Sequence, residues 1–255
     1  MKVDLNADLG ESFGNYKCGM DDEVVRYISS ANIACGFHAS DPSVMKKTVC
    51  MAKKNGVAVG AHPGYPDLSG FGRRNMAIGS DDLINIVQYQ IGAISAFCSA
   101  MQVPLKHVKP HGAMYNMAAK DEKLARAIAE AIMEINPELI LLGLSGSVLI
   151  SAAERIGLKT ASEVFADREY QSDGTLVPRN RENAVIHDED TAARRSVRMV
   201  KEGVVTSIDG KDIPIKADSI CLHGDGEKAV IFAQRIHEEL IREGIEITSI
   251  QHIIC

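Results

Sequence analysis

The sequence predicts an α/β protein folded as a seven-stranded parallel β/α barrel. Seven short apolar segments, several of them rich in Val and Ile, have the composition of strands that are covered on both faces. Longer amphipathic segments separate them, as expected for helices that connect parallel strands. Seven such units within 255 residues favour a closed barrel, with an open, doubly wound sheet as the alternative.

The order of these elements follows from hydrophobic periodicity and from helix-capping residues. The predicted strands cover residues 3–7, 32–35, 57–61, 105–109, 139–144, 160–165 and 219–222. The predicted helices cover residues 42–56, 80–101, 121–135, 189–202 and 227–243.

One segment departs from the alternation of strand and helix. Residues 204–215 contain the pair Asp209-Gly210 between two β-type runs, which predicts a hairpin with a type I′ turn at the rim or the bottom of the barrel. We expect residues 1–255 to form a single domain that carries this hairpin as an insertion.

Composition excludes several classes of protein. The formal net charge is −6, so there is no basic surplus to bind a nucleic-acid backbone. The six cysteines show no C-x-x-C spacing and no secretory leader is visible, which together indicate a reduced, cytoplasmic protein. The most apolar stretch, residues 139–153, is interrupted by Gly and Ser and is too polar to span a membrane.

Polar side chains gather where the predicted strands end. Because parallel strands of a barrel end at one face, these side chains should form one site. Each residue alone could be a helix cap or a satisfied polar group, but scattered placement would not put five of eight histidines beside strand ends. Those histidines are His38, His62, His107, His111 and His223.

Three of these residues suit a divalent transition metal. Asp8, His38 and His62 follow three successive strands, and two imidazoles with one carboxylate leave positions open for water and substrate. The alternative is that the same three side chains only form hydrogen bonds with a substrate.

A second group suits acid–base and anion chemistry. Lys109 stands next to His111, so a cation that stabilises an anion would lie beside a proton-transfer group, although Lys109 could instead only pair with Glu163 or Asp167. The candidate catalytic residues are Asp8, Lys109, His111 and Glu163.

Substrate binding is expected from the loops around this group. Arg73 and Arg74 lie on a Gly-rich loop that could fold over the mouth and clamp an anion, or remain solvated. His223 and Asp225 precede a helix whose N-terminus could hold an anion, unless Asp225 is only its N-cap. The candidate substrate-binding residues are Asn6, Glu11, Arg73, Arg74, Asp167, Arg168, His223 and Asp225.

Long contiguous motifs closely resemble the LamB/YcsF family, over residues 1 to about 248. They are DLNADLGE (4–11), SANIACGFHASD (30–41), GVAVGAHPGYPD (56–67), FGRR (71–74), HVKPHGAMYN (107–116), SEVFADREYQSDGTLVPR (162–179) and CLHGDGE (221–227). A longer segment at residues 12–17 departs from the family pattern and concerns a surface loop.

The resemblance implies a barrel like that of glycoside hydrolases and polysaccharide deacetylases. It also implies ATP-dependent opening of the lactam of 5-oxo-L-proline to L-glutamate, together with two partner subunits, B and C. Asp8, His38 and His62 match positions at which the related deacetylases hold a metal.

No P-loop, dinucleotide-binding motif or nucleophile elbow occurs in the sequence. We therefore expect a partner subunit to share the site for ATP and its Mg²⁺, and this chain to complete hydrolysis of the activated intermediate. Two alternatives remain: a metal-dependent deacetylase or amidase acting on a small amide or amino sugar, and a binding subunit without a catalytic role.

Overall fold

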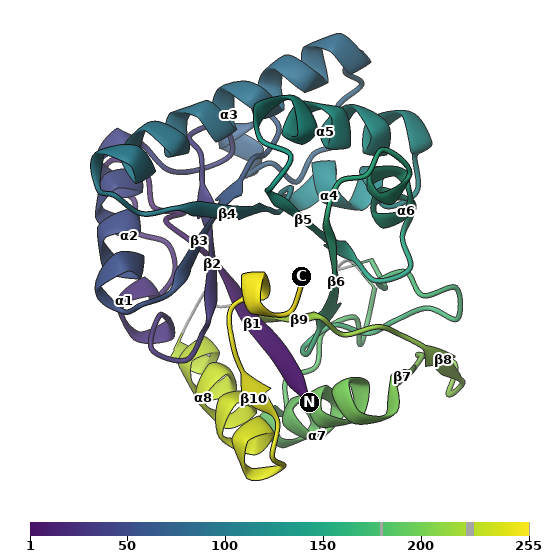
Figure 1. The fold of residues 1–255 in the computed structure, drawn as a ribbon. Helices are drawn as coiled ribbons and strands as arrows, with labels where there is room; N and C mark the ends of the chain where they lie inside the picture. Colours follow the sequence, from purple (N-terminus) through teal and green to yellow (C-terminus); the bar gives the residue numbers. More distant parts are fainter. Residues whose placement is uncertain (179–180, 223–226, 255) are drawn as a thin grey trace.

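The computed structural model, which describes residues 1–178, 181–222 and 227–254, is built around a closed barrel of parallel strands (Figure 1). The strands follow the order β1-β2-β3-β4-β5-β6-β9, and β9 pairs with β1 to close the ring. Their bounds are β1 Lys2–Leu9, β2 Ser30–Ala34, β3 Ala58–His62, β4 Leu105–Val108, β5 Ile140–Leu144, β6 Thr160–Phe165 and β9 Ser219–Leu222. The predicted seven-stranded barrel is confirmed, and the open sheet is excluded.

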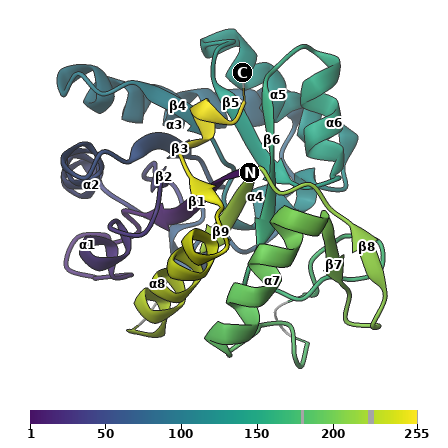
Figure 2. The same ribbon diagram turned by 60° about the horizontal axis from the view of Figure 1, so that its bottom comes forward.

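Helices form the outer layer, connecting each strand to the next (Figures 1 and 2). The five predicted helices all occur, as α2 Pro42–Lys54, α3 Ser80–Ala100, α5 Glu122–Ile135, α7 Glu189–Glu202 and α8 Glu227–Arg242. Asp41 caps α2, because its carboxylate accepts hydrogen bonds from the backbone of Ser43 and Val44. Three further helices were not predicted because they are too short to show periodicity: α1 Asp21–Val24, α4 Gly112–Ala118 and α6 Val148–Arg155.

The hairpin near residues 204–215 consists of β7 (Val204–Thr206) and β8 (Asp212–Pro214), which pair antiparallel beside α7, outside the barrel wall (Figure 2). The predicted type I′ turn is wrong. Gly210 has a φ of +76°, whereas Asp209 is not among the described residues with positive φ. The amide of Gly210 donates to the carbonyl of Ser207, so the loop is a type I turn followed by a left-handed glycine.

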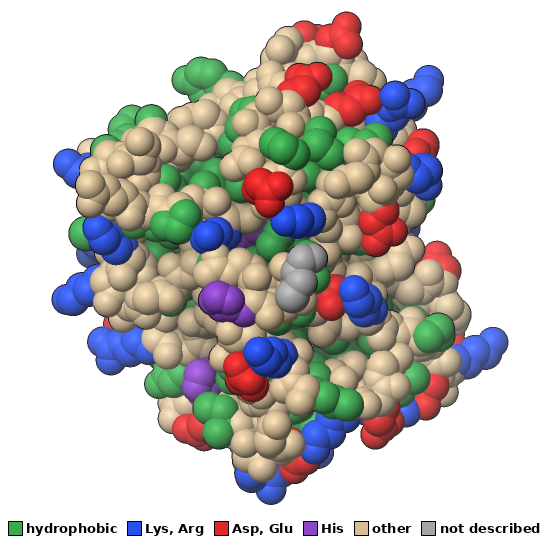
Figure 3. Space-filling model, viewed as in Figure 1, with side chains coloured by type: hydrophobic (Ala, Val, Ile, Leu, Met, Phe, Trp, Pro, Cys, Tyr) green, Lys and Arg blue, Asp and Glu red, His purple; other side chains and the backbone are tan. Residues whose placement is uncertain are grey.

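The amino-terminal end of the barrel is covered by the last part of the chain. β10 (Glu246–Ile247) pairs with the start of β1, and the 3₁₀ turn η2 (Ile250–His252) follows it. Ile250 is fully buried against residues of β5 and β6. This end therefore forms a closed surface, over which charged side chains of both signs are scattered (Figure 3). A substrate must enter from the opposite end, where the strands terminate.

Helix α3 is the one helix in the described part of the chain that is long and apolar enough to cross a membrane by composition. Its buried residues Leu83, Val87, Ile91 and Ile94 recur at helical spacing and belong to the main core. The side chain of the buried Gln90 forms hydrogen bonds with the backbone of Gly64, which follows β3. The 3₁₀ turn η1 (Leu68–Gly70) begins four residues later. These contacts are those of a helix that covers a barrel.

The interior of the barrel is polar, whereas branched apolar residues usually fill this space. On β1, Asp4, Asn6 and Asp8 alternate with buried apolar residues, so every second side chain points inward. Gly60 of β3 makes room for the ring of His107, because a Cβ at residue 60 would lie 2.1 Å from its Nε2 atom.

We predict that Gly60→Ala lowers the free energy of unfolding by about 1–3 kcal/mol, since the new methyl group overpacks the ring of His107. Gly92→Ala is the matched control: no atom lies within 4 Å of the added Cβ, and alanine should stabilise helix α3 by up to about 1 kcal/mol. Thermal and urea unfolding measure both effects. Equal stability of the two variants would contradict the tight packing at Gly60.

Candidate active site at the carboxyl ends of the strands

Lys109, which directly follows β4, is the centre of the site. Its Nζ atom lies 2.8 Å from Oε1 of Glu163 on β6 and 3.0 Å from Oδ1 of Asp8 on β1. The same atom donates to Oδ1 of Asn6 at 3.2 Å and approaches Sγ of Cys221 at 3.2 Å. Three strands thus converge on one ammonium group that is only 3% exposed.

The charges explain why this buried lysine stays ionised. Burial opposes the charged form, but the carboxylates of Asp8 and Glu163 raise the pKa of Lys109 well above its usual value. The second oxygen of Glu163 accepts a hydrogen bond from the hydroxyl of Tyr115 at 2.6 Å, and burial beside Glu163 raises the pKa of that hydroxyl. Glu163 therefore holds Lys109 on one side and a neutral phenol on the other.

The buried amide of Asn32 fixes the orientation of Asp8. The Nδ2 atom of Asn32 on β2 donates to Oδ1 of Asp8 at 2.8 Å and to Oδ1 of Asn6 at 2.7 Å. Nε2 of His107 lies 2.8 Å from Oδ1 of Asn32, and burial next to Lys109 lowers the pKa of His107 to about 3. A neutral His107 must therefore carry its proton on Nε2 and donate it to Asn32.

Asp4 lies deeper in the barrel and accepts hydrogen bonds from three serine hydroxyls. Ser29 and Ser30 donate to its Oδ1 at 2.7 and 2.6 Å, and Ser219 donates to Oδ2. Burial raises the pKa of Asp4 to about 6, although these hydroxyls partly offset the effect. Ser219 also accepts from Nδ2 of Asn6, so this group supports the amide that contacts Lys109.

Three histidines and Glu11 form a cluster beside Asp8. Nε2 of His62 lies 3.0 Å from Nδ1 of His111 and 3.3 Å from Oδ2 of Asp8. Oε1 of Glu11 lies 3.3 Å from Nδ1 of His111 and 3.1 Å from Nε2 of His38. Burial lowers the pKa of His111 to about 3 and that of His38 well below its usual value, so both rings are neutral.

These residues are also those that could hold a metal. One ligand atom from each of Glu11, His38, His62 and His111 lies within 4.8 Å of the others. His38 and His62 were predicted as ligands from the sequence, and Asp8, the third predicted ligand, contacts the set through His62. The backbone of two glycines lies close to these rings, since a Cβ at Gly64 would lie 2.5 Å from His38 and one at Gly72 would lie 2.8 Å from His111.

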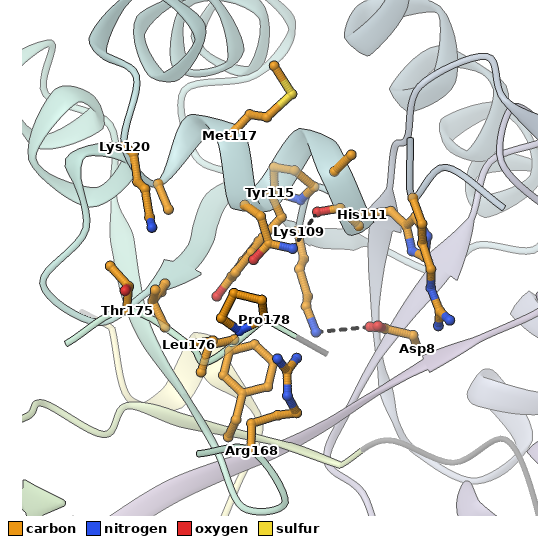
Figure 4. Close-up of a pocket in the computed structure, with 18 of the residues that line it drawn as sticks. Asp8, Lys109, His111, Tyr115, Met117, Lys120, Arg168, Thr175, Leu176 and Pro178 are labelled. Carbon is orange, nitrogen blue, oxygen red and sulfur yellow. Dashed lines mark hydrogen bonds and ion pairs between the residues drawn. The ribbon is translucent and has the colours of Figure 1, made fainter. Parts of the chain in front are cut away.

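A cavity of about 610 Å³ opens above this group and extends away from it (Figure 4). Asp8, Lys109 and His111 lie at its inner end, where the ion pair between Asp8 and Lys109 is visible. Lys120 and Thr175 lie on the far side. Its further lining includes both apolar and cationic residues, namely Arg73, Tyr115, Met117, Leu144, Phe165, Arg168, Leu176, Val177, Pro178 and Leu222.

The side chains of the two arginines of the Gly-rich loop have different surroundings. Arg73 lines the cavity and lies 5.1 Å from the centre of the Phe71 ring. Arg74 instead pairs with Asp67, whose carboxylate also accepts from the amide of Gly70, so it stabilises the loop and does not line the cavity. Sequence alone could not distinguish neighbouring arginines.

The other predicted substrate-binding residues lie in different positions. Arg168 lines the cavity, but its guanidinium also donates to the carbonyls of Val177 and Ala184. Asn6 is fully buried under Lys109, and Asp167 is half-buried outside the cavity lining. Glu11 lies in the histidine cluster. His223 and Asp225 lie outside the described residues.

Sequence reasoning missed Tyr115, Asn32 and Asp4. Tyr115 is one helical turn after His111, so the start of α4 as a helix would have placed it in the site. The polar alternation of Asp4, Asn6 and Asp8 along an otherwise apolar strand was the visible signal for an inward polar face. Asn32 lies within β2, where only the pairing with β1 reveals its role.

Known proteins resemble this chain over nearly its whole length. Residues 3–255 match the LamB/YcsF family. Proteins named as the A subunit of 5-oxoprolinase are 62% identical over 252 residues in Clostridium beijerinckii (99% of each chain) and 58% identical over 249 residues in Bacillus subtilis (98% of this chain, 97% of that one).

Solved structures show the same likeness. The lactam utilization protein from Thermus thermophilus superposes with a TM-score of 0.94 at 46% identity, covering 98% of this chain and all of that one. A putative cellobiose-phosphate cleavage protein from Enterococcus faecalis shares the fold alone, with a TM-score of 0.59 at 14% identity over 100% of this chain and 99% of that one.

Removing one partner of the buried ion pair should be costly. We predict that Glu163→Gln lowers the free energy of unfolding by about 3–5 kcal/mol, because it leaves Lys109 charged, buried and paired only with Asp8. Glu138→Gln breaks an ion pair with Lys159 of the same 2.8 Å length on the surface and should change stability little. Chemical denaturation compares the variants; a similar small loss in both would contradict a charged Lys109.

Asp4 should make stability depend on pH. Its pKa is 3.8 when unfolded and about 6 when folded, so the folded chain binds the extra proton between these values. The contribution of Asp4 to the free energy of unfolding is therefore fully present below pH 4 and falls by about 3 kcal/mol as the pH rises through 6. Between pH 4 and 7, the free energy of unfolding should therefore fall less steeply with pH in Asp4→Asn than in the wild-type chain. An unchanged slope would contradict the raised pKa of Asp4.

Proposed function

The chain belongs to the LamB/YcsF family, and from that membership we propose that it is the subunit of an ATP-dependent 5-oxoprolinase that opens the lactam of 5-oxo-L-proline to L-glutamate. The observation that carries this proposal is the 62% and 58% identity, over almost full length, to proteins named as the A subunit of 5-oxoprolinase. That name supports partner subunits, which we propose are B and C. We place the reaction in the cytoplasm.

The chemistry that the site must perform is hydrolysis of a cyclic amide. Water adds to the lactam carbonyl carbon, the C–N bond breaks, and the leaving nitrogen takes a proton. Resonance makes the amide carbonyl a poor electrophile. ATP would overcome this by converting the carbonyl oxygen to a phosphorylated, activated form, which hydrolysis then turns into glutamate and phosphate.

Lys109 is suited to stabilise the negative oxygen that develops during water addition. Its ammonium is buried and fixed by Asp8 and Glu163, so it needs no reorganisation when charge develops. Either Asp8 or His111 serves as the base, since both lie at the inner end of the cavity. Arg73 lines the same cavity and would bind the carboxylate of 5-oxoproline.

Two observations support an ATP site that is shared between subunits. No recognised nucleotide-binding motif occurs, yet the cavity extends past the catalytic group toward Lys120 and Arg168. We propose that a partner subunit contributes at least part of the site for ATP and Mg²⁺, and that this chain completes hydrolysis of the activated substrate.

A second candidate function is metal-dependent hydrolysis of a small amide or an acetylated amino sugar. The cluster of Glu11, His38, His62 and His111 favours it, because imidazoles and a carboxylate are suitable ligands for zinc. Such a reaction would need neither ATP nor partners. The third alternative is a binding subunit without a catalytic role. It is less favoured, because such a subunit would need neither the candidate bases Asp8 and His111 nor the buried cation Lys109 at its cavity.

The test is an assay that follows glutamate release from 5-oxo-L-proline, with and without ATP and with and without the B and C subunits. We expect glutamate only when ATP and all three chains are present, and no micromolar binding of ATP to the isolated chain. Release of acetate without ATP would favour the deacetylase. Full turnover by all three complexes, containing Asp8→Ala, His38→Ala and His111→Ala respectively, would leave only the binding role.

A further inference from the structure

Two ring nitrogens at the inner end of the cavity, Nε2 of His62 and Nδ1 of His111, face each other across 3.0 Å. Nδ1 of His62 lies 2.7 Å from the carbonyl oxygen of Lys109, and Nε2 of His111 lies 2.8 Å from the carbonyl oxygen of Phe71. A carbonyl oxygen only accepts, so each of these nitrogens donates a hydrogen to its carbonyl. When each ring carries only that one hydrogen, the remaining nitrogens present lone pairs to each other.

Carboxylate oxygens lie on both sides of this pair. Oδ2 of Asp8 is 3.3 Å from Nε2 of His62, and Oε1 of Glu11 is 3.3 Å from Nδ1 of His111. Neighbouring donors in this series are therefore 3.0–3.3 Å apart. Ligand atoms of Glu11, His62 and His111 also all lie within 4.8 Å of one another, and Asp8 joins them through His62. In a tetrahedral zinc site, bonds of about 2.0–2.1 Å place neighbouring ligand atoms roughly 3.3 Å apart.

His38 belongs to the cluster but is poorly placed as a ligand beside His111. The two rings are stacked, with centroids 3.7 Å apart and planes inclined by 3°. An imidazole lone pair lies in the plane of its ring, so parallel rings cannot both direct a lone pair at one ion. Nε2 of His38 instead lies 3.1 Å from Oε1 of Glu11, the position of a residue that orients a ligand.

The surrounding backbone restricts rearrangement. A Cβ at Gly64 would lie 2.5 Å from Nδ1 of His38, and one at Gly72 would lie 2.7 Å from Cβ of His38 and 2.8 Å from Cδ2 of His111. Gly72 also has a φ of +63°, which favours glycine. The backbone at Gly64 and Gly72 therefore leaves the rings of His38 and His111 little room to move.

We propose that Asp8, Glu11, His62 and His111 bind one divalent transition metal ion, zinc in the first instance, with His38 as the residue that orients Glu11. This differs from the set of Asp8, His38 and His62 expected from the sequence. Because Oδ1 of Asp8 binds Lys109 and Oδ2 faces His62, Asp8 connects the metal site to the buried ammonium. The metal site is inferred from this geometry and not from the proposed lactam reaction, although it shares Asp8 and His111 with the residues proposed for that reaction.

The experiment uses the full chain without a histidine tag, stripped with a chelator and titrated with Co²⁺ and then Zn²⁺. We expect one equivalent of Co²⁺ to bind with micromolar or tighter affinity, to give the intense visible absorption of a tetrahedral ion, and to be displaced by zinc. Asp8→Asn, Glu11→Gln and His111→Gln should abolish that absorption. His38→Gln should weaken binding by about 10–100-fold and keep the spectrum.

His237→Gln is the matched control, because His237 lies on α8, away from the site, where its ring contacts the carbonyl of Tyr27. This variant should leave cobalt binding unchanged, and circular dichroism checks the fold of every variant. Absence of stoichiometric binding to the wild-type chain would overturn the proposal and leave a proton shared between His62 and His111. That result would not affect the glutamate-release assay, so the two proposals fail separately.

Discussion

The structure depends on placing one charged ammonium, that of Lys109, inside a protein barrel. An isolated buried charge is strongly unfavourable, so it must be paired and hydrogen-bonded. Asp8 and Glu163 supply the countercharges, and Asn6 supplies a further acceptor. Each of these groups needs its own partners, which is why polar side chains replace the usual apolar filling of the barrel.

The same requirement extends outward to the cavity and inward to the barrel floor. Inward, Asn6 is held by Ser219, which donates to Asp4. Outward, Oδ1 of Asp8 accepts from Lys109 and Asn32, so its Oδ2 faces His62 and the histidine cluster. Asp8 therefore joins a rigid cation on one side to the histidine cluster on the other, and both lie beside the cavity in which a carbonyl would be polarised.

The sequence predicted the barrel because each strand is short, apolar and followed by polar residues, and β6 and β9 have the predicted bounds. It placed Asp8, His62, Lys109 and His111 at one face for the same reason. Pairing could not be predicted, since Lys109 and Asp8 are separated by 101 positions and their contact depends on strand tilt and register. Side-chain direction was equally inaccessible, as the separation of Arg73 from Arg74 shows.

The most direct test of the account is the turnover of the three-subunit complex containing Lys109→Met, a substitution of similar length that removes the ammonium group and its hydrogen bonds. Lys159→Met, which removes a lysine from a surface ion pair, is the control and should retain full glutamate release. With Lys109→Met we expect kcat to fall by about 10²–10³-fold, the usual loss for one preorganised oxyanion donor. Turnover within a few-fold of the wild-type complex, from a folded and assembled variant, would contradict the account.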